Sequence, residues 1–296
     1  MPVPDITIAI PTYNREEVLV NTIHDALNQT IKNIEVLVID QSLAHSAATQ
    51  KALDTIRDKR FRYFQVDPPS VTAARNFALQ QATAPIIIFL DDDVKLDPRF
   101  AAQHLAIYTA RPEVSAAGGR VMQAGFPVHN EILHFDEYAS SRGVFTSPKS
   151  GYTNAFAGGN CSLRVADALK VGGFDTRYYG NAFREESDMS LKMTAAGMKI
   201  WYEPKAELLH LAAPYGGNRV KGHIFDRAVF YRNELFFTLR WTKGRRLRAL
   251  KRKYHEYCWQ GGKRLKIKRS VLFSMGLIVA LWRFVWTKQT IAKERA

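Results

Sequence analysis

The chain has 296 residues, 46% of them hydrophobic and 24% charged, so it can build a core and is not a disordered protein. Its two cysteines, Cys161 and Cys258, lie far apart and outside any metal-ligand spacing, which argues against a disulfide framework or a zinc site. The net charge of +14 is concentrated at one end, because residues 240–296 contain 17 Lys or Arg and 2 acidic residues, against 25 and 26 in the rest. This distribution predicts a neutral body followed by a basic tail.

Short apolar segments alternate with segments of helical periodicity over the first 111 residues. Strands are predicted at 6–10, 34–39, 61–66 and 86–90, and helices at 18–27, 44–58, 70–82 and 98–111. Such alternation is typical of an α/β protein with a mostly parallel central sheet and helices on both faces. A strand is predicted near 114–122, then a long Gly-, Ser- and aromatic-rich stretch to about 158, a helix at 189–196 and a strand at 199–202. Long irregular stretches inside compact domains are often functional loops.

Three adjacent carboxylates, Asp91, Asp92 and Asp93, follow the strand predicted at 86–90. They repel one another unless a cation joins them, and hard oxygen ligands suit Mg²⁺ or Mn²⁺. Ligands of open α/β sheets bind at the carboxyl ends of the strands, where these acids are expected. Taken alone, the triplet is equally compatible with a solvated acidic turn before the helix that Asp97 and Pro98 begin.

Six segments between residue 6 and about residue 210 carry a further signal through their order. They are Pro11-Thr12-Tyr13-Asn14-Arg15, Val38-Ile39-Asp40, Ala73-Ala74-Arg75-Asn76, Asp91-Asp92-Asp93, Gly172-Gly173-Phe174-Asp175 and the acidic segment 185–188. In this order they resemble the family 2 inverting glycosyltransferases with a GT-A fold. The resemblance implies a GT-A domain at 1–240, with a donor half at about 1–122 and an acceptor half at about 123–240. It also implies a nucleotide-diphosphate sugar as donor.

The resemblance assigns roles around the donor. Mn²⁺ or Mg²⁺ on Asp93 would act as a Lewis acid for the departing pyrophosphate, with Asp91 nearer the ribose and His210 completing the metal site. Asp92 is expected to tolerate replacement best of the three acids. Asp40 would accept the N3–H of a uracil ring, or else serve as a helix cap or turn residue. The resemblance implies that Asp40, Asp91 and Asp92 bind the nucleotide sugar. It implies the same role for Pro11, Thr12, Tyr13, Asn14, Arg15, Arg75 and Asn76.

Inversion at an anomeric carbon requires a base that takes the proton of the acceptor hydroxyl. The family usually has Glu-Asp, a variable residue and then Asp-Leu, whereas this chain has Glu185-Glu186-Ser187-Asp188-Met189. Alignment on Asp188, the third acid of this catalytic segment, places the base at Glu186, and Glu185 is the alternative. An acidic first turn that stabilises a helix dipole is compatible with either assignment.

The basic tail predicts a membrane contact. Basic clusters at 243–253 and 263–269 precede an apolar segment at 271–286. Sixteen helical residues reach about 24 Å, short of the ~30 Å hydrocarbon core, so a single span near 270–287 is the lesser alternative. We expect residues 241–296 to form a helical tail that lies on an anionic membrane through residues 241–287. A helix packed on the catalytic domain is a second alternative, and nucleic acid is not expected because no binding motif accompanies the charges.

No basic region followed by an apolar core begins the chain, so we expect a cytoplasmic protein, peripheral or monotopic on the inner face of the plasma membrane. Processive members of the family carry Gln-x-x-Arg-Trp, whereas Phe237 stands in place of Gln before Arg240 and Trp241. The sequence therefore predicts transfer of a single sugar, with a UDP-sugar as the expected donor, to a hydroxyl of a lipid-linked or polysaccharide precursor. The alternatives are a nucleotidyltransferase of similar fold and a non-catalytic membrane- or nucleic-acid-binding protein.

Overall fold

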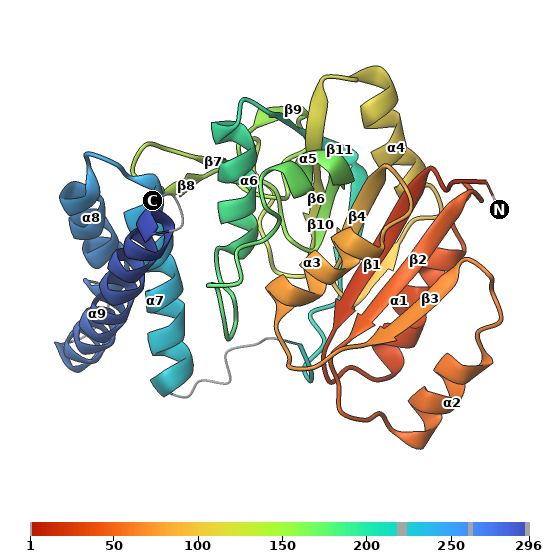
Figure 1. The fold of residues 1–296 in the computed structure, drawn as a ribbon, viewed down its shortest axis with the longest axis horizontal. Helices are drawn as coiled ribbons and strands as arrows, with labels where there is room; N and C mark the ends of the chain where they lie inside the picture. Colours follow the sequence, from red (N-terminus) through yellow and green to blue (C-terminus); the bar gives the residue numbers. More distant parts are fainter. Residues whose placement is uncertain (1, 218–223, 260–262, 294–296) are drawn as a thin grey trace. The chain divides into compact units, whose positions relative to one another are not determined.

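The computed structural model describes residues 2–217, 224–259 and 263–293 (Figure 1). The chain divides into two compact units, which we call the sheet unit and the helical unit. The sheet unit comprises Met1–His134, Arg142–Thr176 and Glu185–Gly217. The helical unit comprises Phe135–Ser141, Arg177–Arg184 and Asn218–Ala296. The predicted boundary at residue 240 does not coincide with this division, because the helix before it groups with the tail helices.

Four parallel strands form one part of the sheet, in the order β3-β2-β1-β4 (Figure 1). They are β1 (Ile6–Thr12), β2 (Ile34–Asp40), β3 (Phe61–Gln65) and β4 (Ile86–Leu90). The helices between them are α1 (Glu17–Leu27), α2 (Ala47–Thr55) and α3 (Val71–Gln81). All seven elements lie where the apolar periodicity predicts them. β1 continues through Pro11 and pairs Thr12 with Asp40 of β2, so two predicted donor residues lie side by side.

The rest of the sheet mixes both strand directions. β6 (Val114–Met122) and β11 (Lys199–His210) are parallel to each other, while β10 (Asn160–Arg164) lies antiparallel between β4 and β6. β5 (Val94–Leu96) and β9 (Gly151–Thr153) pair antiparallel with β11. The other elements here are α4 (Phe100–Ala110), α5 (Val165–Lys170), α6 (Glu185–Ala195) and the ribbon of β7 (His134–Phe135) with β8 (Ser141–Arg142). β10 was not predicted. His210 ends β11 rather than following a strand that stops at residue 202.

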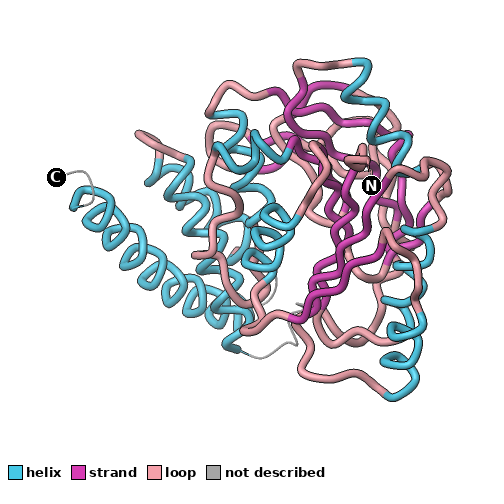
Figure 2. Tube along the Cα trace, turned by 45° about the vertical axis from the view of Figure 1, so that its right-hand side comes forward, coloured by secondary structure: helices cyan, strands magenta, loops and turns pink. Residues whose placement is uncertain are grey.

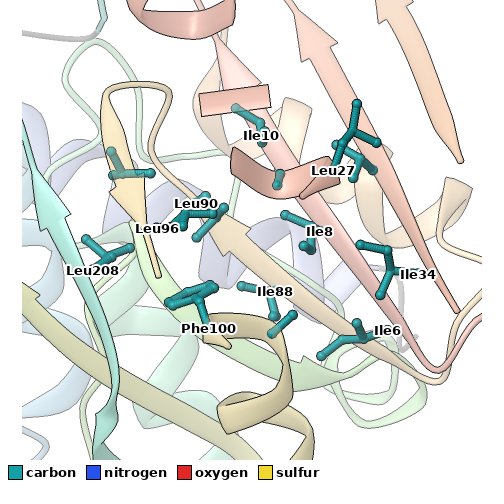
Figure 3. Close-up of a cluster of buried hydrophobic side chains, with 14 of the residues drawn as sticks. Ile6, Ile8, Ile10, Leu27, Ile34, Ile88, Leu90, Leu96, Phe100 and Leu208 are labelled. Atoms are coloured by element: carbon teal, nitrogen blue, oxygen red, sulfur yellow. The ribbon is translucent and has the colours of Figure 1, made fainter. Parts of the chain in front are cut away.

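Helices cover both faces of this sheet, as predicted (Figure 2). On one face, Ile6, Ile8 and Ile10 of β1 pack with Ile88 of β4 and with α1, α2 and α4 (Figure 3). On the other face, the alternate residues of the same strands, such as Ile87 and Phe89, pack with α3, α5 and α6. Burial on both faces explains why these strands are apolar throughout instead of alternating.

The helical unit contains α7 (Ile224–Trp241), α8 (Arg246–Cys258) and the long α9 (Lys263–Lys293). α9 packs closely on α7 at Gly276, where an added Cβ would lie 2.9 Å from the Tyr231 Cβ. Tyr254 of α8 donates to or accepts from Ser270 of α9 at 2.9 Å, and its ring meets Phe273 edge-on. Within the part of the chain that the structure describes, no helix is long and apolar enough to cross a membrane. The side chains at 283–287 of the alternative span lie outside that part.

One buried histidine links α4 to the inserted strand β10. His104 is fully buried, with Nδ1 2.9 Å from Ser162 Oγ and Nε2 3.0 Å from Asn160 Oδ1. Burial lowers the pKa of His104 to about 4, although the hydrogen bond with Asn160 opposes the change. The folded chain therefore keeps this imidazole neutral at pH values where an exposed histidine becomes charged.

This histidine should make the fold sensitive to acid. The pKa in the unfolded chain is near 6.5, so the unfolded state takes up the proton first and stability is lost as the pH falls from 6.5 towards 4. We expect a loss of about 2 kcal/mol in the free energy of unfolding between about pH 7 and pH 5 from this residue. Urea unfolding of the wild type and of His104→Gln at both pH values measures it. Equal losses in the two proteins would contradict the assignment.

Candidate active site

The acid triplet lies at the carboxyl end of β4, and its three side chains differ in environment. Asp93 is almost fully buried; its Oδ1 lies 3.1 Å from His210 Nε2, and its Oδ2 accepts from the Ala213 N–H at 2.8 Å. Arg15 Nη2 donates to the same Oδ2 at 2.9 Å. Burial raises the pKa of Asp93, but His210 and Arg15 lower it more, so it stays below its usual range. The Asp91 side chain is 47% exposed, with Oδ2 3.9 Å from His210 Nε2.

A second contact orients His210. Its Nδ1 lies 2.6 Å from Gln123 Oε1, so this nitrogen carries a proton that it donates to the amide oxygen. In neutral imidazole the Nε2 lone pair would then face the Asp93 carboxylate at 3.1 Å, which is unfavourable unless a proton or a metal ion lies between them. Gln123 is therefore a site residue that the sequence did not reveal, since no motif marks it.

The residues present fit a divalent cation of the Mg²⁺ or Mn²⁺ type. Such ions are usually held by one or two carboxylates together with waters and substrate phosphates, and Asp91, Asp93 and His210 offer that donor set. Among the described residues, no group of three or more His, Cys, Asp or Glu side chains is arranged to hold a metal ion on its own. The arrangement thus suits a metal that the donor pyrophosphate helps to bind.

Asp92 points into the protein. Its Oδ2 accepts from Thr12 Oγ1 at 2.7 Å and its Oδ1 from Arg15 Nε at 2.8 Å, and all three side chains are buried. This burial argues against the expectation that Asp92 tolerates replacement best, because its removal would leave Arg15 without one of two buried carboxylates. Thr12 and Arg15, predicted as nucleotide-sugar ligands, are held within this network.

A loop after β11, residues 211–217, lies against the loop after β1, and the sequence did not predict this. Arg15 Nη1 donates to the carbonyl oxygens of Ala213 and Tyr215, and the Gly217 N–H donates to Tyr13 O at 2.8 Å. At Gly216, with φ +80°, an added Cβ would lie 2.2 Å from the Asn14 carbonyl oxygen. The pair Gly216-Gly217 was the available sequence signal, since both positions need left-handed backbone.

Arg15 should not be replaceable by lysine. A guanidinium can bridge Asp92, Asp93 and two carbonyl oxygens at once, whereas an ammonium is a single point of charge. We expect Arg15→Lys to lower the free energy of unfolding by about 1–2 kcal/mol in urea. The matched control is Arg99→Lys, whose side chain is 72% exposed beside Asp97 and should change stability by less than about 0.5 kcal/mol. Similar small effects in both variants would show that the Arg15 bridge contributes little.

Asp40 is fully buried at the end of β2. Its carboxylate accepts from the Ser42 N–H at 2.7 Å and from Tyr63 Oη at 2.6 Å, and lies 2.5 Å from His45 Nε2. Burial raises the pKa of Asp40, but these hydrogen bonds lower it more, so it lies below its usual range. The backbone contact with Ser42 is the turn role considered from the sequence. A uracil N3–H would have to share this carboxylate with His45 or Tyr63.

Arg75 and Asn76 of α3 both point at neighbouring protein groups. The Arg75 guanidinium is buried beside the Phe89 and Phe174 rings, with Nη1 3.0 Å from Glu185 Oε1. The Asn76 amide accepts from the Phe174 N–H at 2.7 Å and donates to the Phe174 carbonyl at 2.8 Å. Asn76 thus holds the Gly-Gly-Phe-Asp turn, and its role as a nucleotide-sugar ligand stays a prediction. The Ala-Ala-Arg-Asn motif on α3 and the Gly-Gly-Phe-Asp motif at 172–175 therefore contact each other.

Gly158 and Gly159 bring the start of β10 against these groups. An added Cβ at Gly159 would lie 2.0 Å from Asp91 Oδ2, and one at Gly158 would lie 2.7 Å from Arg75 Nη2. Only glycine allows so close an approach of the backbone to both charged side chains. The sequence contained this glycine pair, but its role depends on the pairing of β10 with β4.

The acidic segment forms the first turn of α6, where the three acids are placed differently. Glu185 and Asp188 are buried, whereas Glu186 is partly exposed and accepts from Ser187 Oγ at 3.2 Å. Burial raises the pKa of the Glu185 carboxyl, and the Arg75 guanidinium beside it opposes the rise. Of the two candidate bases, Glu186 is therefore the more exposed.

Comparison with known proteins identifies the family to which this chain belongs. A model described as Glycosyl transferase family 2 matches residues 7–172, more than half of the chain. The O-antigen chain rhamnosyltransferase of Salmonella typhimurium is 25% identical over 235 residues, which cover 76% of this chain and 72% of that protein. An uncharacterized glycosyltransferase of Rickettsia conorii is 36% identical over 88 residues, 30% of this chain and 14% of its own length. Four such relatives, from Rickettsia and Haemophilus influenzae, are matched over only 13–38% of their length.

The fold has a counterpart among solved structures. A mannosyltransferase from Pyrobaculum calidifontis, in complex with GDP-Man and Mn²⁺, superposes with a TM-score of 0.57 and 17% identity. The superposition covers 96% of this chain and 88% of that one. This likeness identifies the fold, which is the predicted α/β GT-A architecture.

Proposed function

Because the chain belongs to glycosyl transferase family 2, we propose that it transfers one sugar, with inversion, from a UDP-sugar to a hydroxyl of a lipid-linked or polysaccharide precursor. The observation that carries the proposal is the meeting of Asp93, Asp91 and His210 at the end of β4. When bound there, Mn²⁺ or Mg²⁺ would neutralise the charge of the departing nucleoside diphosphate. The Mn²⁺ in the Pyrobaculum complex supports such a metal site.

On the donor side, this chain's own residues would fix the nucleotide. Asp91 is the exposed acid of the triplet and would contact the ribose, while Tyr13 and Asn14 lie in the loop that the 211–217 segment contacts. Asp40 would accept from the base if His45 or Tyr63 gives way. Pro11 and Thr12, the last two residues of β1, lead the chain into this loop.

On the acceptor side, Glu186 would take the hydroxyl proton as the new bond to the sugar forms. Glu186 lies in the first turn of α6, the end of a helix where the helix dipole favours acidic side chains. Glu185, paired with Arg75, would hold α3 to α6 and so keep Glu186 in place as a positioning residue. Asp188, fully buried in the same turn, would have a similar structural role.

Membrane association would follow from one face of α9. Five apolar side chains of this face are each between 48% and 68% exposed, namely those of Ile267, Val271, Met275, Ile278 and Trp282. They follow one another at intervals of four, four, three and four residues, which places them on one side of the helix. Lys266, Lys268 and Arg269 lie near the start of α9, next to the first of these apolar residues. Apolar side chains beside basic ones suit an anionic lipid surface.

Vesicle flotation tests this part of the proposal. We expect Ile278→Asp to weaken binding to vesicles rich in phosphatidylglycerol, because an exposed apolar contact is replaced by a negative charge. The control is Leu169→Asp, because Leu169 is a 48% exposed leucine on α5 of the sheet unit. Equal flotation of both variants and of the wild type would contradict binding through α9.

A screen of nucleotide sugars for thermal stabilisation tests the donor assignment. A ligand at about 100 times its dissociation constant stabilises the folded state by about 2.7 kcal/mol. The proposal predicts stabilisation by UDP-sugars in the presence of Mn²⁺, and loss of it with EDTA. Stabilisation by nucleoside triphosphates alone, with release of pyrophosphate, would favour the nucleotidyltransferase alternative. Stabilisation by neither class would favour a non-catalytic binding protein.

A further inference from the structure

A pocket of about 590 Å³ lies within the helical unit, beside α8 and the turn that precedes β8. Its lining consists of Ser140, Ser141, Arg248, Lys251, Arg252, His255 and Glu256. None of these residues belongs to the donor or acceptor machinery proposed above. The pocket is therefore a separate feature that the transfer reaction does not explain.

The pocket carries positive charge that the chain does not neutralise. Its four basic side chains are spaced three, four and seven residues from the first, so they share one face of α8. The one acid in the lining, Glu256, has its Oε2 3.3 Å from Lys253 Nζ. In the part of the chain that the structure describes, neither Arg248 nor Lys251 pairs with a carboxylate.

One carboxylate fixes both walls of the pocket. Asp136 Oδ1 accepts from the backbone N–H groups of Tyr138 at 2.9 Å and of Ser140 at 3.0 Å, which closes the turn. Asp136 Oδ2 accepts from Arg252 Nη1 at 2.9 Å, and the Arg252 guanidinium also lies over the Tyr138 ring. Arg252 is thereby held at the turn before any ligand arrives.

The turn also supplies a hydroxyl without a partner. Ser140 is only 4% exposed, and its buried Oγ has no hydrogen-bond partner among the described residues. An unpaired buried hydroxyl costs free energy unless a ligand or water satisfies it. Rotation about the Cα–Cβ bond lets this hydroxyl donate to an acceptor in the pocket.

We propose that this pocket binds a phosphate ester group. A phosphate monoester offers three terminal oxygens in a tetrahedral arrangement, so it can accept from Arg248, Lys251, Arg252 and Ser140 together. A carboxylate offers only two oxygens in one plane and could satisfy fewer of these donors. The phosphate can be carried by an anionic membrane lipid or by a lipid-linked acceptor, or it can belong to a small soluble ester. The site depends only on the helical unit and does not require that sugar transfer occurs.

Paired charge variants of the full chain test the site. Arg248→Gln combined with Lys251→Gln removes two charges from the pocket, while Lys243→Gln combined with Arg245→Gln removes two from exposed positions outside this lining. Binding is measured to phosphatidylcholine vesicles that contain phosphatidic acid, and to vesicles given the same surface charge by a fatty acid. Titration with glycerol phosphate provides the soluble arm. Ser140→Ala, a minimal change, is the variant least able to disturb folding.

We expect the pocket double variant to bind phosphatidic acid vesicles about tenfold or more weakly, and Ser140→Ala about two- to fivefold more weakly. The control double variant should lose less than about twofold, and fatty-acid vesicles should not distinguish the variants. Glycerol phosphate that binds with the same variant dependence would show that the ester alone suffices, whereas vesicle binding alone would show a lipid-borne phosphate. Equal losses in the two double variants would overturn the proposal, since diffuse charge would then explain the binding.

Discussion

Replacing Glu186 by Gln should lower the rate of sugar transfer roughly 10²- to 10⁴-fold, the range that a general base contributes. The amide cannot take the proton of the acceptor hydroxyl, yet it keeps nearly the same shape at a partly exposed position. Binding of the nucleotide donor should therefore stay unchanged. Initial rates of transfer, together with thermal stabilisation by the donor, measure the two effects separately.

Two further variants distinguish the base from its neighbour. Glu186→Asp retains a carboxylate of the type usual in the family and should retain more activity than Glu186→Gln. Glu185→Gln removes the partner of Arg75, so its main effect should be on stability, because a buried arginine loses its charge partner. If Glu185→Gln abolished transfer in a fully folded protein while Glu186→Gln did not, the two roles would have to be exchanged.

Replacing Glu234 by Gln should lower the free energy of unfolding by about 3–5 kcal/mol. Glu234 is fully buried on α7, with Oε2 2.6 Å from Arg184 Nε and Oε1 2.8 Å from Lys253 Nζ. Burial raises the pKa of Glu234, but the two cations lower it more, so it is ionised and below its usual range. An amide there would remove the buried negative charge that both cations share and would leave Lys253 with only the 45% exposed Glu256. Urea unfolding measures the loss.

A matched control uses the same cation. Glu256 also pairs with Lys253, at 3.3 Å, but its side chain is 45% exposed. Glu256→Gln should therefore cost less than about 1 kcal/mol. Comparable losses for Glu234→Gln and Glu256→Gln would show that burial does not increase the contribution of the Glu234 pair to stability.

Local pattern was sufficient to predict the parallel part of the sheet. The runs 34–39 and 86–90 are apolar, short and bounded by turn residues, so their strands follow from composition and length. β10 is different, because its place between β4 and β6 depends on pairing with residues of two strands that precede their partners by more than forty positions. A single sequence does not reveal that pairing.

In the candidate site, too, some features could be predicted from the sequence and others depend on partners that are distant in sequence. The meeting of Asp93 with His210 agrees with what chemistry and motif order predicted, although His210 comes from a longer strand than expected. The positions of Asp92 and Asn76 could not be predicted, because each is determined by a partner distant in sequence, Arg15 or Phe174. Gln123 belongs to the site for the same reason.

The most direct test of the account is the rate at which nucleoside diphosphate is released from a UDP-sugar in the presence of acceptor. We predict release by the wild type with Mn²⁺, and its loss both on addition of excess EDTA and in Asp93→Ala, because Asp93 lies 3.1 Å from His210 at the centre of the proposed metal site. Full turnover by Asp93→Ala in excess EDTA would contradict the account.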